Sequence, residues 1–289
     1  MEAHEAVMRS RREMLLCCAL VLGTAMTFVA GTTVPQETDR SKDGLIGPVR
    51  QMTIISGRTT TIRSYDRAGA LMETMSRLAP PAEEPEAQEQ VRRFAYVYNA
   101  KEQRVREMSQ DQDGLPYLSR RYAYDAGGRQ WAEAAYHMCG TFSSLRIFSY
   151  DRKGRLQEEL LYQYRSLAKR VYAYDDRGFL HTLLSYKNGQ LQSTIHSRHD
   201  AEGRKLELTE SMPDGTPNGK TTYEYDEQGH LMAEHFINAL DPSHETTSDY
   251  KYDQHGNWIQ KTTRGVGGVH KDEPDDQAIE VTERTLVYF

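Results

Sequence analysis

Seven aspartates recur along the chain, each directly after a tyrosine or a histidine. A row of carboxylates could ligate a metal ion or act in acid–base catalysis. If each copy opens an equivalent hairpin, however, successive carboxylates lie about 10 Å apart, which is too far for two to share one cation. We therefore expect the aspartates to bend the backbone, and we expect no catalytic residue, no metal site and no cofactor. They are Asp66, Asp125, Asp151, Asp175, Asp200, Asp226 and Asp253.

Three shorter motifs resemble reactive sites but have simpler structural interpretations. In "HSRH", His196 and His199 are three residues apart, which places them on opposite faces of a strand and disfavours a shared metal ion. The stretch "DGTPNGKT" (214–221) has three residues between its glycines where a phosphate loop has four, and a strand pattern follows, so we expect a hairpin loop. Cys139 has no activating neighbour in the sequence, and we expect it to be packed.

Aromatic residues stand three and one positions before most of the aspartates. A spacing of two puts both rings on one face of a strand. This face could pack against its own sheet, or it could bind the flat faces of sugar rings or a protein partner. The candidate binding face consists of Tyr122, Tyr124, Phe148, Tyr150, Tyr172, Tyr174, Tyr223, Tyr225, Tyr250 and Tyr252.

A glycine follows each aspartate three residues later, which is where a type I turn closes with a left-handed residue. From Asp125 to Asp253 the aspartates are 24 to 27 residues apart, and each interval holds two strand patterns and two turns. A fixed period of this kind predicts a repeat array. We therefore expect an all-β antiparallel meander. The turn glycines are Gly69, Gly128, Gly154, Gly178, Gly203, Gly229 and Gly256.

The repeated phrase, as in "YDRKGRLQEE" (150–159) and "YEYDEQGHLMAE" (223–234), resembles the YD repeat, also called the RHS repeat. The stretches "GLIGPVRQMTI" (44–54) and "YDQHGNWIQKTT … VTERTLVYF" (252–289) are similar to parts of small secreted bacterial members. Larger members wind such repeats into a hollow β-shell. With only about eight hairpins here, we expect an open, twisted, partly curled sheet.

The N-terminus has the layout of an export signal. Arginines precede the apolar run "MLLCCALVLGTAMTFVA" (14–30), and small residues follow it. We expect a signal peptide with a helical core over 1–31, of the Sec or twin-arginine type, and a disordered linker over 32–43. One β-domain should span 44–289, with an acidic Pro-rich loop at 78–90 and a flexible loop at 264–277.

The charge balance restricts the class of partner. The formal net charge is −6 and no basic run occurs, which argues against nucleic-acid binding. Strands such as "REMSQDQ" (106–112) and "KLELTES" (205–211) are polar on both faces, so we do not expect an integral membrane protein.

We expect an exported, periplasmic or extracellular, non-catalytic YD-repeat protein that acts as a binding or scaffolding module at the bacterial cell envelope. A carbohydrate-binding module and an accessory or immunity protein of an RHS-type toxin system are the alternatives. The partner could also add a strand to an unpaired sheet edge. The sequence does not define the oligomeric state.

Overall fold

The chain outside its N-terminal segment forms a single antiparallel sheet. The computed structural model describes residues 38–83, 86, 88–110, 114–240, 245–266 and 278–289. These residues form one short helix, α2 (Asp39–Lys42), and 18 strands. The strands are β1 (Val49–Ser56), β2 (Thr59–Tyr65), β3 (Leu71–Leu78), β4 (Gln90–Tyr98), β5 (Arg104–Gln110), β6 (Pro116–Tyr124), β7 (Gln130–Tyr136), β8 (Phe142–Tyr150), β9 (Leu156–Gln163), β10 (Ser166–Tyr174), β11 (Leu180–Lys187), β12 (Gln190–His199), β13 (Lys205–Ser211), β14 (Pro217–Tyr225), β15 (Leu231–Asn238), β16 (Glu245–Tyr252), β17 (Trp258–Val266) and β18 (Ala278–Tyr288).

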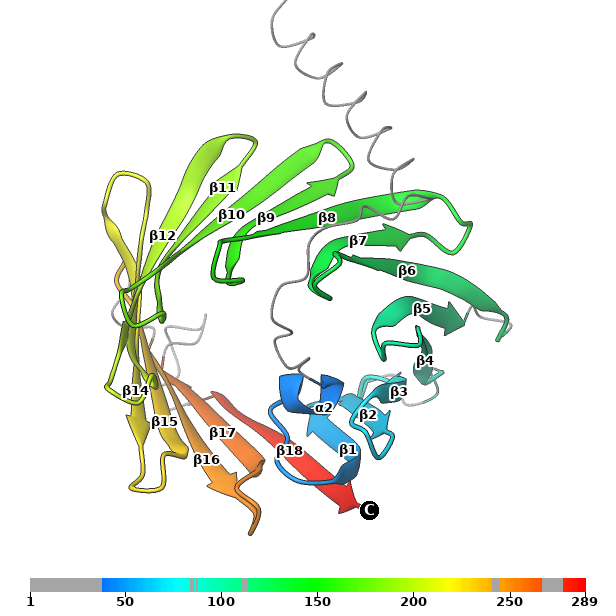
Figure 1. The fold of residues 1–289 in the computed structure, drawn as a ribbon. Coiled ribbons are helices and arrows are strands. Elements are labelled where there is room, and N and C mark those ends of the chain that lie inside the picture. Colours follow the sequence, from blue (N-terminus) through cyan, green and yellow to red (C-terminus); the bar gives the residue numbers. More distant parts are fainter. Residues whose placement is uncertain (1–37, 84–85, 87, 111–113, 241–244, 267–277) are drawn as a thin grey trace, which may run out of the picture.

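Each strand pairs with its neighbours in the sequence, and the first strand also pairs with the last. β1 pairs antiparallel with both β2 and β18, so the sheet closes into a barrel (Figure 1). The prediction of an open, partly curled sheet was therefore wrong. Closure satisfies the main-chain groups that an open sheet would leave unpaired at its two ends. It also removes the edge to which a partner strand could have been added.

The repeated aspartates lie in the turns that join the strands. The Asp151 Oδ1 atom accepts hydrogen bonds from the main-chain N–H groups of Lys153 and Arg155, both at 2.9 Å. Gly154 takes φ +82° in the same turn, a conformation that glycine adopts with little steric strain. Where the chain reverses, these N–H groups lack a main-chain acceptor, and the aspartate carboxylate accepts their hydrogen bonds instead.

A side chain after several of these turns links one repeat to the next. The Arg129 Nη2 atom lies 2.7 Å from the Asp125 Oδ2 atom, and its guanidinium lies over the Tyr150 ring at 5.1 Å. The Tyr150 hydroxyl donates back to the carbonyl oxygen of Gln130 at 2.6 Å. Asp151, Arg155 and Tyr174 repeat the arrangement one unit later. We call this set of aspartate, arginine and tyrosine contacts the rim staple.

Alternate residues of each strand face the lumen and the outer surface. Packing is densest where the barrel closes, around Leu45, Val49, Met52, Tyr65 and Leu71. A second buried cluster lies on β7 and β8, at Ala132, Ala134 and Leu145.

The prediction that the chain is not an integral membrane protein was wrong. It assumed that a strand with polar groups on both faces cannot belong to such a protein. In a closed barrel one face of every strand lines the lumen and can be polar. Glu107 and Ser109 of the stretch 106–112 are nearly buried, and Glu107 lines a lumen cavity. A closed antiparallel barrel is moreover the β-architecture that can cross a bilayer.

In the part of the chain that the structure describes, no helix has both the length and the apolar composition needed to cross a bilayer.

The structure agrees with some of the predicted segment boundaries and differs from others. Residues 1–37, with the expected signal peptide, lie outside the described residues, whereas 38–43 of the expected disordered linker form α2 and its caps. The predicted loop 78–90 connects β3 to β4, and three of its residues are outside the described ranges. Of the predicted loop 264–277, the first three residues belong to β17 and the others are not described.

Candidate binding site in the barrel lumen

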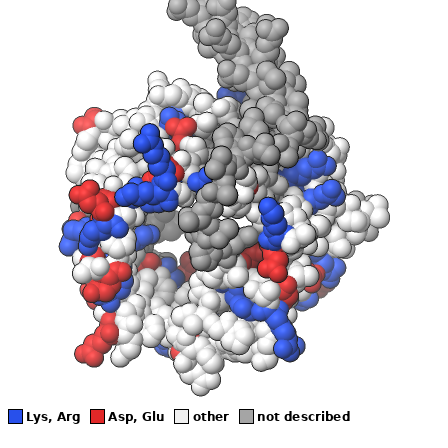
Figure 2. Space-filling view, in the orientation of Figure 1, with Lys and Arg blue, Asp and Glu red and all other residues white. Residues whose placement is uncertain are grey.

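A cavity of about 640 Å³ lies in the lumen beside α2. Its walls come mainly from β2 to β8, and α2 forms one side. Figure 2 looks into the hollow centre of the barrel and shows basic and acidic side chains intermixed around it. Five cationic and five acidic side chains line the cavity, so their formal charges cancel: Lys42, Arg63, Arg104, Arg120 and Arg146 with Asp39, Asp43, Glu102, Glu107 and Glu133.

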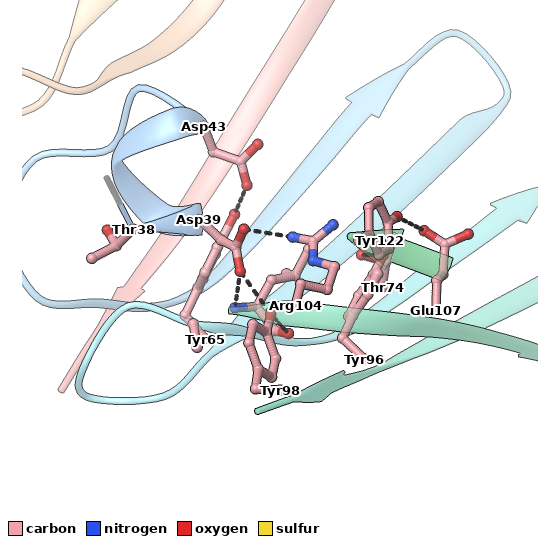
Figure 3. A network of polar contacts seen from close by, with 12 residues as sticks. Thr38, Asp39, Asp43, Tyr65, Thr74, Tyr96, Tyr98, Arg104, Glu107 and Tyr122 are labelled. Atoms are coloured by element: carbon pink, nitrogen blue, oxygen red, sulfur yellow. Dashed lines mark hydrogen bonds and ion pairs between the residues drawn. The ribbon is translucent and has the colours of Figure 1, made fainter. Parts of the chain in front are cut away.

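The short helix α2 is fixed in the lumen by its first carboxylate (Figure 3). The Asp39 Oδ1 atom lies 2.6 Å from the Arg104 Nη2 atom. The Tyr98 hydroxyl lies 2.6 Å from both Asp39 Oδ2 and the carbonyl oxygen of Leu71. Burial lowers the pKa of Arg104, but the Asp39 carboxylate together with Tyr98 and Tyr122 outweighs burial and raises the pKa overall. Burial, with the neighbouring Asp39, also raises the pKa of Tyr98. The Tyr98 hydroxyl is therefore neutral at physiological pH.

The second carboxylate of this segment anchors the other end of α2. Asp43 accepts hydrogen bonds from the Arg63 guanidinium and from the Tyr65 hydroxyl. The Arg284 Nη2 atom donates to the carbonyl oxygen of Asp43 at 3.1 Å. Arg284 is 8% exposed and lies over the Trp258 ring. This single helix turn is thus held by arginines from separate strands of the barrel.

Glu107 is the centre of the polar wall opposite α2. It is only 5% exposed. The Ser119 hydroxyl donates to it at 2.8 Å, the Tyr122 hydroxyl at 3.2 Å, and the Arg120 guanidinium at 3.2 Å to each oxygen. Burial, followed by the Glu107 charge, raises the pKa of Tyr122. Tyr122 consequently stays a neutral hydrogen-bond donor over the whole physiological pH range.

Acidic and basic residues alternate along the lumen wall from β5 to β9. Glu107, Arg120, Glu133, Arg146 and Glu159 are each 13 residues apart, which is half of the 26-residue spacing seen in several repeats. Successive members approach to 3.2, 3.3, 3.9 and 3.1 Å. We call this row the charge ladder. The sequence reasoning missed it, although a search for period 13 in charged residues would have found it.

The ten aromatic residues predicted as a binding face occupy the lumen side of the barrel. Of the ten, only Tyr122 and Tyr124 line the cavity. Burial raises the pKa of Tyr124 to about 12, and its hydroxyl donates to the carbonyl oxygen of Arg104. Side chains of neighbouring elements cover five of the rings: Arg129 lies over Tyr150, Arg155 over Tyr174, Arg204 over Tyr225, Lys261 over Tyr250 and His230 over Tyr252. Tyr172 donates to Glu159, and Phe148 and Tyr223 stand on the lumen face of β8 and β14.

Sequence analysis missed Tyr96 and Tyr98 as site residues, although they belong to the same repeat series. Both line the cavity. The Tyr96 hydroxyl donates to Thr74 at 3.0 Å, and the Arg104 guanidinium lies 4.5 Å from the centre of the Tyr96 ring. These two residues precede Asn99, which replaces the usual aspartate.

The remaining sequence motifs take no part in this site. His196 stacks edge-on against His181, and His199 stacks on Phe179. Cys139 was expected to be packed but is exposed, with its Sγ atom 3.0 Å from the Thr141 hydroxyl. In the 214–221 stretch, residues 214–216 lie in the turn between β13 and β14, and residues 217–221 begin β14. Within the described ranges, no group of three or more His, Cys, Asp or Glu side chains is arranged to hold a metal ion.

The chemistry available in the cavity is hydrogen bonding without net charge. Four of the five carboxylates and all four guanidiniums of the lining are engaged with one another, yet each retains unused donor or acceptor capacity. The Nε atoms of Arg63 and Arg104 are buried and have no hydrogen-bond partner. Tyrosine hydroxyls and rings complete the wall. Such a surface suits a neutral ligand that carries many hydroxyl groups.

No protein-family model matches the chain, and no curated protein matches it. Solved structures with a similar course of the chain include a porin-like protein from Bacteroides uniformis, at 10% identity and a TM-score of 0.49, over 84% of this chain and 99% of that chain. Another is a TcdB2-TccC3-Cdc42 structure, at 14% identity and a TM-score of 0.38. A third is the Photorhabdus luminescens Tc holotoxin pore, at 12% identity and a TM-score of 0.31. Each of these two alignments covers 77% of this chain, but only 12% and 15% of the respective toxin chain.

Proposed function

We propose that this chain is an exported, non-catalytic binding protein of the bacterial cell envelope, a YD-repeat barrel that takes a small neutral carbohydrate into its lumen. The observation that carries the proposal is the cavity of about 640 Å³ with equal numbers of cationic and acidic side chains. Sites for small molecules have volumes of about 300–1,000 Å³. The basic and apolar N-terminal residues support export.

A neutral ligand is favoured over a charged one by the pairing of the lining residues. A free carboxylate or phosphate entering the cavity would have to break Asp39–Arg104 or Glu107–Arg120 to bind those guanidiniums, and among the described lining cations Lys42 forms no ion pair. A hydroxyl group can instead donate to a carboxylate and accept from a guanidinium without separating them. The aromatic platform expected from the sequence contributes less, because cations already lie over several of the rings.

Calorimetric titration of the full chain, purified after export by a bacterial host, with a panel of neutral and acidic oligosaccharides tests this function. We expect a neutral member to bind. Tyr122→Phe and Glu133→Gln should each weaken that binding by about tenfold, the equivalent of about 1.4 kcal/mol. The matched control is Tyr223→Phe, a lumen-facing tyrosine outside the cavity wall, which should leave the affinity unchanged. Preferential binding of acidic sugars, or equal losses in all three variants, would contradict the proposal.

A further inference from the structure

Three successive hairpins place an aromatic ring directly opposite a carboxylate on the lumen wall. Opposed side chains of an antiparallel pair lie on the same face of the sheet, about 5 Å apart. The first two pairs line the cavity beside α2, and the third follows on β8 and β9. We call these six residues the lumen belt: Tyr96 with Glu107, Tyr122 with Glu133, and Phe148 with Glu159.

Side-chain contacts place the third pair on the same wall as the first two. The Glu159 Oε1 atom lies 3.1 Å from the Nε atom of Arg146, which lines the cavity. The Tyr172 hydroxyl donates to Glu159 Oε2 at 2.9 Å. Phe148 is directly opposite Glu159 and therefore shares its face. One surface of rings and carboxylates thus runs from β4 to β9 and continues beyond the cavity.

Arginines form the outermost polar layer of this surface. The side chains of Glu107 and Glu159 are only 6% and 11% exposed, whereas those of Arg120, Arg146 and Arg170 are 46%, 39% and 57% exposed. Arg120 lies 3.2 Å from Glu107, and Arg170 lies 3.6 Å from Glu159. A guanidinium oriented by a carboxylate in this way still has N–H groups that can donate into the lumen. Oxygen atoms of a ligand would therefore meet fixed donors beside aromatic rings.

The three rings of the lumen belt differ in what already covers them. The Arg104 guanidinium lies 4.5 Å from the centre of the Tyr96 ring and 5.8 Å from that of Tyr122. These two residues can still offer their ring edges and hydroxyl oxygens to a ligand. Among the described residues no cation lies over the ring of Phe148. Phe148 is consequently the ring of the belt on which the flat, apolar face of a sugar can pack.

The lumen belt repeats at every second strand. Its carboxylates stand on β5, β7 and β9, so successive pairs are two strand spacings apart, or about 10 Å. This spacing is close to the length of a disaccharide in an extended chain, in which every second ring presents the same face. Three pairs at this spacing would contact the first, third and fifth rings of one linear oligosaccharide that crosses the strands.

The pattern ends after the third pair. In the next two hairpins the opposed residues include no carboxylate, because Tyr172 is opposite Leu183 and Ser197 is opposite Leu208. A pair of the same kind recurs on β14 and β15, but there the Lys261 Nζ atom lies 3.0 Å from the Glu234 carboxylate. At the other end of the lumen belt α2 forms the side of the cavity. The number of sugar rings that the belt can contact is therefore limited.

We propose that the lumen belt binds a linear, neutral oligosaccharide in an extended conformation, as formed by β-1,4-linked sugars. This inference rests on the proposed function, which it narrows from a neutral carbohydrate to an extended chain of about five units. Alternate rings of the chain contact the three aromatic–acid pairs. The arginines of the wall donate hydrogen bonds to its hydroxyl and ring oxygens, and no charge on the ligand is required, because each arginine is paired with a glutamate.

Calorimetric titration of the full exported chain with β-1,4-linked glucose and mannose oligosaccharides of two to six units tests this inference. We expect one series to bind with an affinity that rises about 100-fold from two units to five and is constant from five to six. Each further pair that is contacted should contribute about tenfold. An α-1,4-linked glucose series, whose chain coils, should show no such rise.

Two variants at the third pair sharpen the test. Phe148→Ala should lower the affinity for the five-unit chain about tenfold and move the plateau from five units to three. Arg170→Gln, at the same end of the lumen belt, should act in the same direction. It provides the readout if circular dichroism shows that Phe148→Ala loses its sheet. The matched control is Tyr223→Ala, at the pair whose glutamate is held by Lys261, and it should leave the dependence on chain length as in wild type.

The outcomes separate this inference from the function on which it rests. If a neutral sugar binds with the same affinity at every chain length, the extended chain is overturned and the proposed function stands. An equal effect of Phe148→Ala and Tyr223→Ala on the chain-length dependence would also overturn the inference alone. If no neutral sugar of any length binds, both are overturned.

Discussion

The side-chain amide of Asn257 pairs with both main-chain polar groups of Ile46. The Ile46 N–H donates to Asn257 Oδ1 at 2.7 Å, and Asn257 Nδ2 lies 2.9 Å from the Ile46 carbonyl oxygen and 2.9 Å from the Tyr288 hydroxyl. Asn257 is 1% exposed. The Tyr288 hydroxyl also lies 2.6 Å from the Asp253 Oδ2 atom. One turn of the last repeat therefore holds the segments that lead into β1 and out of β18, the two strands that close the barrel.

Asn257→Ala should destabilise the closed barrel by about 2–3 kcal/mol, because it leaves buried groups of Ile46 without partners. Urea denaturation followed by tyrosine and tryptophan fluorescence measures the change. Gln254→Ala, an exposed residue of the same turn, is the control and should change stability by less than about 0.5 kcal/mol. Equal stability of the two variants would contradict the assigned role of Asn257.

The rim staple predicts a favourable coupling between Arg155 and Tyr174. Arg155 lies over the Tyr174 ring at 4.4 Å, so a double-mutant cycle of Arg155→Ala and Tyr174→Leu should yield a coupling of about 0.5–1 kcal/mol. The same cycle with Arg152, an exposed residue in the preceding turn, should yield none. A coupling near zero for Arg155 would show that the stacking is structurally visible but energetically negligible.

Gly203 and Gly215 offer a matched comparison of turn glycines, because both have φ +87°. A Cβ atom at Gly203 would lie 2.4 Å from the Phe179 ring, whereas at Gly215 nothing lies within 4 Å. Both alanine variants should lose about 1 kcal/mol through the left-handed backbone. Gly203→Ala should lose a further 1–2 kcal/mol, roughly, by displacing Phe179 from His199. Thermal unfolding compares them, and equal losses would exclude the steric contribution.

Stability should fall in acid as the turn carboxylates become protonated. The main-chain N–H of Arg155 makes the largest contribution to lowering the pKa of Asp151 below its usual 3.8. A lowered pKa in the folded state favours folding above pH 3.8, and this contribution is lost as the pH falls through the lowered value. Urea midpoints measured from pH 6 down to pH 2 should show the decline. Asp151→Asn should have a shallower decline than wild type, and an unchanged slope would contradict the role of this carboxylate.

Alkaline conditions should also destabilise the barrel, through its buried tyrosines. Burial, followed by the Glu159 hydrogen bond, raises the pKa of Tyr172 to about 12, and burial is also the main cause of the rise to about 12 for Tyr250. A raised pKa in the folded state favours folding below the usual value of 10.0, and this contribution is lost as the pH rises towards 12. Absorbance titration at 295 nm should show ionisation delayed relative to the denatured chain. Tyr172→Phe should reduce the stability loss between pH 10 and 12.

Local patterns in the sequence predicted the strands and the way in which they follow one another. Tyr-x-Tyr-Asp with a glycine three residues later encodes a strand and a turn by itself, because the carboxylate, the left-handed glycine and the spacing of two act over fewer than ten residues. The meander follows, since short turns pair neighbouring strands. The all-β fold class could therefore be predicted from local sequence patterns alone.

Closure and the site required the tertiary structure. β1 and β18 are separated by more than 200 residues, and whether they meet depends on the curl accumulated over all the strands between them. Closure also decided which face of each strand became the lumen, and so turned the tyrosines inward.

The sequence by itself determined the repeat unit, because turn chemistry and side-chain alternation are local properties of the backbone. Only the tertiary structure decided that Asp39 of α2 would meet Arg104 of β5, and that Glu107, Arg120 and Glu133 would form one wall. Those contacts depend on the radius and register of a closed barrel, which are set by the sum of many small strand twists and by no single motif.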